Sequence, residues 1–238
     1  MPSMILDLLQ QSDDAGLGSR LSRGETLADQ AYSRLRQGLM SGQLKPEQVL
    51  TVRGVAASFG VSLTPVREAM QRLVSEQALI IENSRTIRIP RLDLEAYREI
   101  LKIRLDLEYM AAREAAVRID DAEIDALESA AMAHLAAIRA GDARRTLAAN
   151  TEFHLRMYRA SRCDILCGII ESLWLRVGPT LNLLFPQYCG SLIGHEMHRV
   201  AIDALRRRDA DIVAETMRDD LATGAQYLMR LLERPRPG

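Results

Sequence analysis

From residue 93 to residue 233, apolar side chains recur three and four positions apart, and no segment shows the alternation typical of a strand. Aromatic residues are only 4% of the chain although hydrophobic residues make up 47%, which also favours helices. Gly178-Pro179 should break one of these helices. The expected helices, bounded by Asp, Gly or Ser, are 94–118, 121–139, 142–160, 162–184, 191–207 and 209–233. Residues 93–238 therefore predict an all-helical bundle with its own core.

The N-terminal part follows a different pattern. Apolar spacing predicts a helix over 26–41, a short one around Val52–Phe59, and a third that begins near Ser62–Pro65. In the third helix, Thr64-Pro65 fits an N-cap followed by proline at the first helical position.

Two β-like runs follow, Leu79–Glu82 and Thr86–Pro90, with Asn83-Ser84-Arg85 as the turn between them. Three helices and a hairpin predict a winged helix-turn-helix over residues 25–92. Residues 1–24 predict a mobile arm, in which Met4–Gln10 could form a short helix.

The charge balance separates the two parts. The whole chain carries 31 basic and 32 acidic residues, a net charge of -1, which excludes a polycation that coats nucleic acid. Residues 25–92 have nine basic and six acidic residues, a net of +3, and residues 93–238 have a net of -3. The basic excess therefore lies where a phosphate backbone would need it.

The first turns of the third helix carry the residues expected to read DNA. In a helix-turn-helix, the second helix of the motif enters the major groove and its N-terminal side chains reach base edges. Ser62, Thr64 and Arg67 occupy these positions. Arg53 begins the preceding helix and Arg85 lies at the hairpin tip, where each could meet phosphate or a base edge. The alternative is that these residues are helix caps and solvated charges.

The stretch GVSLTPVREAMQRL, with the sequence around it, resembles the N-terminal domain of GntR-type bacterial transcription regulators. The chain departs from the usual family pattern at Leu63, where arginine is common, so a different operator sequence is implied. By this resemblance, the DNA contacts fall on six residues: Arg53, Ser62, Thr64, Arg67, and Arg85 and Thr86 in the wing.

The helical part contains a candidate metal site. Asn150 and His154 are four residues apart and share one helix face, while His198 and Asp220 lie on two later helices. Two imidazoles and a carboxylate suit zinc, with nickel, manganese or iron(II) as alternatives. From spacing alone the signal is weak, because a lone helical histidine is more often a core or surface residue.

The segments NTEFHLRMYRAS, EMHRVAIDAL and TMRDDL resemble the effector domain of the FadR branch of GntR regulators. Many members of that branch have Asp, His, His and His at these places and bind a divalent metal beneath a small carboxylate effector. His154 and His198 match, whereas Asn150 and Asp220 depart from the pattern. The alternative is a metal-free cavity in which these four side chains bond each other or the effector.

Three further residues are candidates for effector binding. His195 lies one turn before His198 and could join it or replace it, with a polar pocket or surface role preferred. Arg104 is expected to pair with Glu108 on its own helix more than to clamp an effector, although an arginine at a similar place faces the cavity in the FadR branch. Asn182 could line the same pocket. His134 is expected on a solvated helix face.

These patterns predict a ligand-responsive transcriptional regulator that binds double-stranded operator DNA as a homodimer, a repressor released by a small organic acid. The alternative is a metal-dependent hydrolase or lyase that uses the His/His/Asp site, but no general base is paired with a nucleophile, so no enzyme is predicted. An architectural DNA binder would not need so large a second domain. The three cysteines, the lack of a signal peptide and the lack of a long apolar run predict a cytosolic protein that does not enter membranes.

Overall fold

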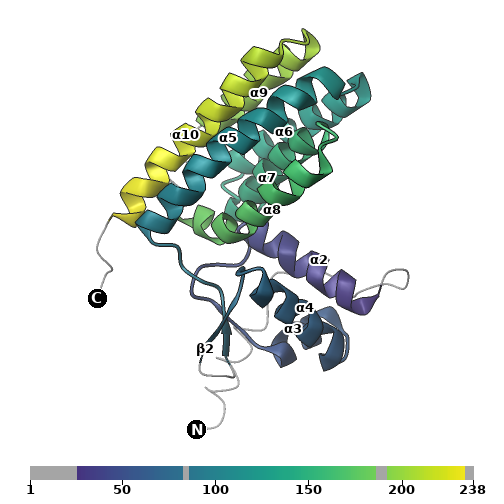
Figure 1. The fold of residues 1–238 in the computed structure, drawn as a ribbon, viewed down its shortest axis with the longest axis vertical. Coiled ribbons are helices and arrows are strands. Elements are labelled where there is room, and N and C mark those ends of the chain that lie inside the picture. Colours follow the sequence, from purple (N-terminus) through teal and green to yellow (C-terminus); the bar gives the residue numbers. More distant parts are fainter. Residues whose placement is uncertain (1–25, 83–85, 186–191, 234–238) are drawn as a thin grey trace.

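The computed structural model describes residues 26–82, 86–185 and 192–233, and it stacks a helical bundle on a smaller N-terminal part (Figure 1). The predicted arm over 1–24, its short helix at Met4–Gln10 and the wing residue Arg85 lie outside these residues. In the described part, no helix is both long enough and apolar enough to cross a membrane.

The N-terminal part consists of three helices and a small antiparallel sheet. The helices are α2 (Leu27–Met40), α3 (Val52–Phe59) and α4 (Leu63–Ser75), and the strands are β1 (Val49–Leu50), β2 (Ile80–Glu82) and β3 (Thr86–Arg88). The sheet order is β1-β3-β2, so β3 is central and Ile87 pairs with both neighbours. The sequence predicted β2 and β3 but not β1, because two residues are too few to show an alternating pattern.

The start of α4 differs from the prediction. Its N-cap is Ser62, in an extended backbone conformation, and not Thr64. Pro65 is therefore the third helical residue and not the first. The first four N–H groups of a helix have no partner within it, so proline is tolerated there without loss of a hydrogen bond.

The bundle follows the predicted blocks closely. It consists of α5 (Leu94–Arg118), α6 (Asp121–Arg139), α7 (Ala143–Arg159), α8 (Asp164–Val177), the 3-10 helix η1 (Gly178–Leu184), α9 (Ile193–Arg206) and α10 (Ala210–Leu232). The side chains of Asp93, Asp120 and Asp142 accept hydrogen bonds from the first turns of α5, α6 and α7, as the sequence indicates. The break at Gly178-Pro179 is confirmed, because α8 ends at Val177 and continues as η1.

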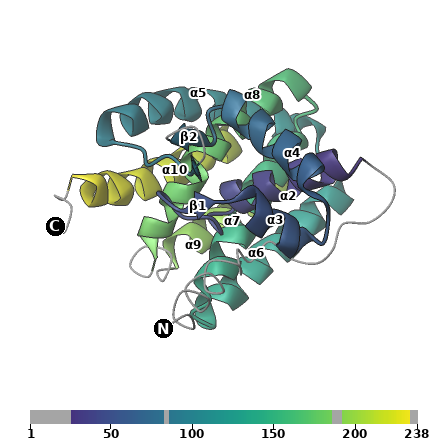
Figure 2. The same cartoon turned by 90° about the horizontal axis from the view of Figure 1, so that it is seen from below.

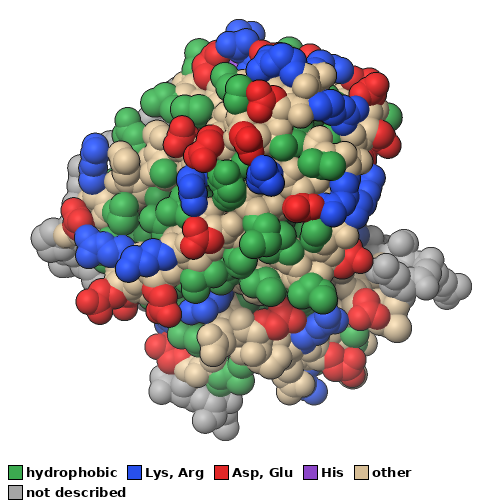
Figure 3. Space-filling view, turned by 45° about the horizontal axis from the view of Figure 1, so that its top comes forward, with side chains coloured by type: hydrophobic (Ala, Val, Ile, Leu, Met, Phe, Trp, Pro, Cys, Tyr) green, Lys and Arg blue, Asp and Glu red, His purple; other side chains and the backbone are tan. Residues whose placement is uncertain are grey.

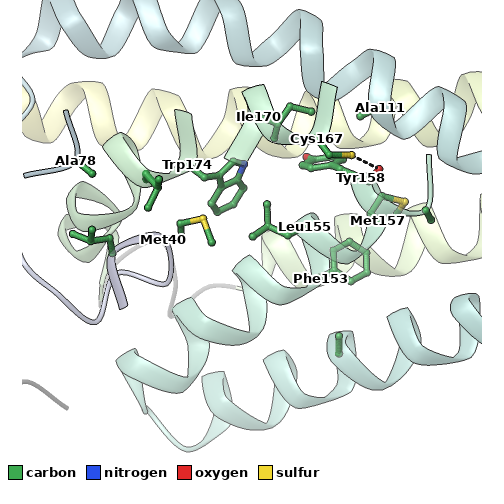
Figure 4. Packing of buried hydrophobic residues seen from close by; sticks show 14 of the residues in the cluster. Met40, Ala78, Ala111, Phe153, Leu155, Met157, Tyr158, Cys167, Ile170 and Trp174 are labelled. Carbon is green, nitrogen blue, oxygen red and sulfur yellow. Dashed lines mark hydrogen bonds between the residues drawn. The ribbon is translucent and has the colours of Figure 1, made fainter. Parts of the chain in front are cut away.

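The two parts share one hydrophobic core. Met40, at the end of α2, points toward Trp174 of α8, with Leu155 of α7 beside them (Figure 4). Viewed from below, α2, α3 and β1 lie over the bundle (Figure 2). The cores are continuous, so a shift in the bundle can reach the N-terminal helices directly.

Three polar contacts hold this junction. The Thr151 hydroxyl of α7 lies 3.2 Å from the Met40 carbonyl oxygen and shares its one proton between this oxygen and the Leu147 carbonyl oxygen of its own helix, at 2.9 Å. The Asn182 amide of η1 donates to the Gly42 carbonyl. Arg36 of α2 pairs with Glu171 of α8 at 2.8 Å. The C-terminal end of α2 is therefore bonded to the bundle as well as packed within its own domain.

Candidate functional site

The first turn of α4 presents polar side chains to solvent. Ser62, Thr64 and Arg67 are all exposed, and Ser62 makes no capping hydrogen bond through its side chain. Leu63, at the same place, is 40% exposed, so an apolar surface lies among them. The start of this helix therefore offers hydrogen-bond donors, hydrogen-bond acceptors and one apolar side chain. These are the groups that recognise base edges and the thymine methyl group.

The arginines of the N-terminal part fall into two groups. Arg72 stacks on the Tyr32 ring at 3.7 Å, and Arg88 pairs with Glu82 at 2.8 Å. Arg53 and Arg67 are exposed and form no ion pair or hydrogen bond within the described residues. Their charges are therefore available to an external phosphate or base. Of the two predicted wing contacts, Thr86 is half-buried at the start of β3.

A small cavity lies inside the bundle. It has a volume of about 60 Å³, enough for an ion with a few waters or for a small carboxylate, since one water needs roughly 10–15 Å³. α5, α7, α8, η1 and α10 all contribute to its wall. The lining residues are Tyr97, Arg104, Asn150, His154, Trp174, Leu181, Leu184, Asp220, Leu221, Gly224 and Ala225.

Two of these lining residues, His154 and Asp220, form a buried cluster with His198 of α9, which does not itself line the cavity. His154 Nε2 lies 3.1 Å from Asp220 Oδ2, and His198 Nε2 lies 3.6 Å from the same oxygen. One ligand atom from each of the three residues lies within 4.8 Å of the others. Ligands bound to one tetrahedral zinc at 2.0–2.2 Å are about 3.3–3.6 Å apart. The two distances from Asp220 Oδ2, 3.1 Å and 3.6 Å, are close to this separation.

Hydrogen bonds behind His154 orient its ring. Tyr158 Oη donates to Glu108 Oε2 at 2.7 Å, and Glu108 also pairs with Arg104 at 2.5 Å. Burial, reinforced by Glu108, raises the pKa of Tyr158 well above its usual value, so the hydroxyl keeps its proton.

That proton is directed to Glu108, so His154 Nδ1, 3.1 Å from the hydroxyl oxygen, must be the donor in the second bond. The other ring nitrogen, Nε2, then points toward Asp220, with 3.1 Å between Nε2 and Oδ2. A hydrogen bond on the far nitrogen is the usual way to orient a ligating histidine.

The charges at the cavity also favour a cation. Burial alone would raise the pKa of Asp220, but His154 and His198 outweigh it and hold that pKa well below its usual range. Burial lowers the pKa of His198, and neither ring nitrogen of His198 has a hydrogen-bond partner in the described residues. With Arg104 and Glu108 cancelling each other, the site carries one negative charge and an unpartnered imidazole. The three residues therefore fit a divalent ion.

The remaining candidates lie in different places. Asn150 lines the cavity one turn before His154, and Arg104 lines it while paired with Glu108, with its guanidinium 4.6 Å from the Trp174 ring. Asn182 does not line it, because its amide donates across the domain junction to Gly42 and, at 3.0 Å, to Pro179. Its assignment to the effector site is therefore not supported by its position.

His134 and His195 were predicted less well. The prediction of a solvated His134 is wrong: it is 4% exposed, because its face of α6 packs on α9 and its ring lies 5.1 Å from that of His198. His195 is also buried, which rules out a surface role, and it is not among the cavity-lining residues. All four histidines of the chain thus lie buried around Asp220.

Sequence reasoning missed the anchoring role of Glu108 and Tyr158. The available signal was the four-residue spacing from Arg104 to Glu108 and from His154 to Tyr158, which places each pair on one helix face. No pattern in the sequence indicated that the two pairs meet, because α5 and α7 are joined through the tertiary fold.

Comparison with known families assigns both parts of the chain. The model described as "Bacterial regulatory proteins, gntR family" matches residues 27–89, and the model described as "FCD domain" matches residues 99–223.

Individual relatives extend over nearly the whole chain. The HTH-type transcriptional regulator McbR of Escherichia coli (strain K12) is 32% identical over 203 residues, covering 83% of this chain and 92% of the relative. The HTH-type transcriptional repressor RspR of the same strain is 24% identical over 203 residues, covering 85% and 89%. The solved structure of E. coli McbR/YncC matches with a TM-score of 0.82 at 29% identity, covering 87% of this chain and 99% of that one.

Proposed function

Because the chain belongs to the GntR family of bacterial regulatory proteins and carries an FCD domain behind its helix-turn-helix, we propose that it is a repressor that a small carboxylate releases from operator DNA. It would act as a homodimer in the cytoplasm, where the DNA lies. The observation that carries the DNA-binding role is the start of α4, whose exposed polar side chains have no partners among the residues that the structure describes. The relatives are regulators, so the hydrolase or lyase alternative finds no support.

We assign DNA contacts to Arg53, Ser62, Thr64 and Arg67, with Arg85 and Thr86 in the wing. The test is Arg67→Ala, measured by fluorescence anisotropy on DNA from upstream of the protein's own gene. A lost bidentate contact weakens binding by about 5- to 150-fold, since such contacts contribute about 1–3 kcal/mol.

The matched control is Arg207→Ala, which removes the same charge from an exposed position of the helical domain. It should bind DNA like the wild type. Equal binding by the Arg67→Ala variant would contradict the assignment.

We propose that His154, His198 and Asp220 hold a divalent metal, with Asn150 as a weaker fourth ligand. Zinc suits the set first, with nickel and manganese as alternatives. When bound, the ion would supply a positive centre for an anionic effector. It would convert the local charge of -1 into +1, and a carboxylate would otherwise face Asp220 unscreened.

Metal content per chain, measured by mass spectrometry after dialysis, tests this assignment. The wild type should retain one ion and the double variant His154→Ala, His198→Ala should retain none. Replacing Asn150→Asp should tighten binding, because a carboxylate is the stronger ligand. A metal-free wild type that still binds organic acids would favour the metal-free cavity instead.

For the effector, we assign Arg104 as the residue that meets its carboxylate. It lines the cavity, and its terminal nitrogens have no hydrogen-bond partner in the described part. His195 does not line the cavity, so it would support the position of His198 and would not contact the effector. A thermal-shift screen of small organic acids is the direct test, since a ligand at 100 times its dissociation constant stabilises by about 2.7 kcal/mol. An acid that stabilises the wild type should not stabilise an Arg104→Met variant.

A further inference from the structure

A second pocket lies where the N-terminal part meets the bundle. Its volume is about 660 Å³, which is typical of small-molecule sites and far larger than the cavity beside His154. The loop between α2 and β1, the connection from β3 to α5, the start of α7 and η1 all contribute to its wall (Figure 1). Asn182 and Gly42, which are bonded across the junction, are among its lining residues. Residues of both parts therefore surround one space.

The side chains around this pocket carry an excess of positive charge. Lys45, Arg91 and Arg144 line it, and Glu47 is the only acidic member of its described lining. Glu47 pairs with Arg91 at 3.5 Å. Lys45 and Arg144 are exposed, and their side chains form no ion pair or hydrogen bond within the described residues. The lining therefore has two more positive than negative side chains.

Elsewhere on the bundle, arginines lie beside acidic partners. Arg113, Arg206 and Arg208 each pair with an aspartate at 2.7–3.0 Å. Basic and acidic side chains lie side by side over the face seen in Figure 3. Like charges that share a pocket repel each other, and an anion between them removes this repulsion. The unpaired cations at the junction therefore indicate an anionic ligand.

A buried hydroxyl in the wall also lacks a partner. Thr180 of η1 lines the pocket and is fully buried, and its Oγ1 has no hydrogen-bond partner in the part of the chain that the structure describes. Buried polar groups are nearly always hydrogen-bonded, so each exception needs an explanation. A hydrogen bond between this hydroxyl and an oxygen of a bound anion supplies one.

The lining favours one class of anion. A phosphate monoester carries about -1.5 to -2 charges at pH 7 and has three acceptor oxygens, which matches an excess of two positive charges spread over three basic side chains. Arginine suits phosphate because its guanidinium donates two parallel hydrogen bonds. Pro46, Leu183 and Phe185 also line the pocket, and they offer apolar surface to an organic group attached to the phosphate.

We propose that this junction pocket binds a small organic phosphate through Lys45, Arg91 and Arg144. The site lies outside the bundle cavity, so it goes beyond the carboxylate effector of the proposed function. Lys45 belongs to the N-terminal part and Arg144 to the bundle, so the bound phosphate bridges the two parts and stabilises their present arrangement. A DNA backbone carries the same group, but residues 93–238 have a net charge of -3, which disfavours a long polyanion in a pocket walled by the bundle.

The test is calorimetric titration of the full chain, dialysed free of metal, with phenyl phosphate at physiological ionic strength. Phenyl phosphate should bind more tightly than inorganic phosphate, and phenol should not bind. Lys45→Ala and Arg144→Ala should each weaken the binding of phenyl phosphate by about 10-fold or more, since each removes a hydrogen bond to a charged group.

The matched control is Arg145→Ala, which removes the next arginine along α7. Its side chain is 81% exposed, and it does not line this pocket. Because salt screens exposed charges that do not touch the ligand, this variant should bind phenyl phosphate like the wild type. Circular dichroism of all three variants checks that the fold is kept.

The possible outcomes separate this site from its alternatives. Weakened binding in Lys45→Ala and Arg144→Ala, with Arg145→Ala unchanged, supports the junction site. Equal weakening in all three variants, or a wild type that does not bind millimolar phenyl phosphate, overturns it. Binding that requires added zinc would place the phosphate at the bundle cavity and also overturns it. If the two variants keep phenyl phosphate but lose operator DNA, these cations contact the DNA backbone and the proposal is wrong.

Discussion

At the scale of single residues, the cavity depends on which atoms carry protons. Arg104, Glu108, Tyr158 and His154 form one connected chain of hydrogen bonds, and Nε2 at its end faces Asp220. The resemblance of three segments to the effector domain of a known family, more than residue spacing, made His154, His198 and Asp220 predictable as a set. The hydrogen-bond chain behind them was not predictable, because it joins residues 50 positions apart.

Removal of the Tyr158 hydroxyl should weaken metal binding without removing a ligand. In Tyr158→Phe, His154 Nδ1 loses its acceptor, so the tautomer that offers Nε2 to the metal is no longer favoured. Loss of such a supporting bond typically costs 10- to 100-fold in metal affinity. Calorimetric titration with zinc would measure it, and Tyr109→Phe, a half-buried tyrosine of α5, serves as control. Unchanged affinity would contradict the role of the hydroxyl.

The buried histidines should make the metal-free protein sensitive to mild acid. Burial, reinforced by His198, lowers the pKa of His134 to about 3, whereas an unfolded histidine titrates near 6.5. Between these values the unfolded chain binds a proton that the folded chain does not. The contribution of the buried histidine to the free energy of unfolding is therefore fully present above about pH 6.5. It falls as the pH drops, by up to about 1.4 kcal/mol per pH unit for each such histidine.

Urea unfolding between pH 7 and pH 5, with a chelator present, measures this slope. The pKa of Asp220 is depressed, so that carboxylate stays ionised over the whole range and adds nothing to the change. The slope of the unfolding free energy against pH reports the number of protons taken up on unfolding. In His134→Gln that number should fall by about one. The same slope in both proteins would mean that His134 is protonated in the folded state.

At the scale of elements, the caps explain why the helix bounds were predictable. Aspartates and glycines at the joins predicted α5 to α10 to within about two residues, which is the normal uncertainty of a helix end. The prediction for α4 was off because both Ser62 and Thr64 can cap a helix, and local sequence does not decide between them. β1 is a strand because Val49 and Leu50 pair with β3. That pairing joins residues far apart in the sequence, so the local sequence does not predict it.

The break between α8 and η1 should be intolerant of any side chain. A Cβ on Gly178 would lie 2.3 Å from the Leu39 carbonyl oxygen and 2.7 Å from the Met40 Cα. Both are backbone atoms, so Gly178→Ala must push α2 away from η1. The expected loss is about 1–3 kcal/mol in the free energy of unfolding. Thermal denaturation would measure it.

The matched control is Gly168→Ala in the middle of α8, where an added Cβ meets nothing within 4 Å. It should stabilise the protein by about 0.5–1 kcal/mol, since alanine is the better helix former. If the two substitutions had equal effects, the tight contact at Gly178 would be excluded as the cause.

At the scale of the whole molecule, α7 joins the cavity to the DNA-binding part. Asn150 and His154 face the cavity, while the Thr151 hydroxyl, between them in sequence, is shared between the Met40 carbonyl of α2 and the Leu147 carbonyl of α7. These residues are 111 positions apart, and Asn182 and Gly42 are 140 apart, so neither junction contact could be predicted from the sequence. The division of the chain into a DNA-binding part and a helical bundle could be predicted, because it follows from local periodicity and charge.

Loss of the Thr151 contact should uncouple the two parts. In Thr151→Val the shape is kept and the hydroxyl bond is lost, so zinc and DNA should each bind separately much as before. The change in DNA affinity caused by an effector acid should shrink from the typical 5- to 150-fold toward none. Anisotropy titrations with and without the acid measure the ratio. Thr146→Val, whose hydroxyl bonds within α7, is the control. An undiminished ratio would exclude this route.

The attachment of α2 to the bundle also limits which effector domains could be joined to this DNA-binding domain in a chimera. A chimera that joins this DNA-reading part to a foreign sensor inherits Leu39, Met40 and Gly42 but loses the surface that receives them. A compatible sensor needs a glycine where Gly178 stands, a hydroxyl for Thr151 and an amide for Asn182. The DNA-binding domain can therefore be exchanged only together with the three bundle residues that receive it, Thr151, Gly178 and Asn182.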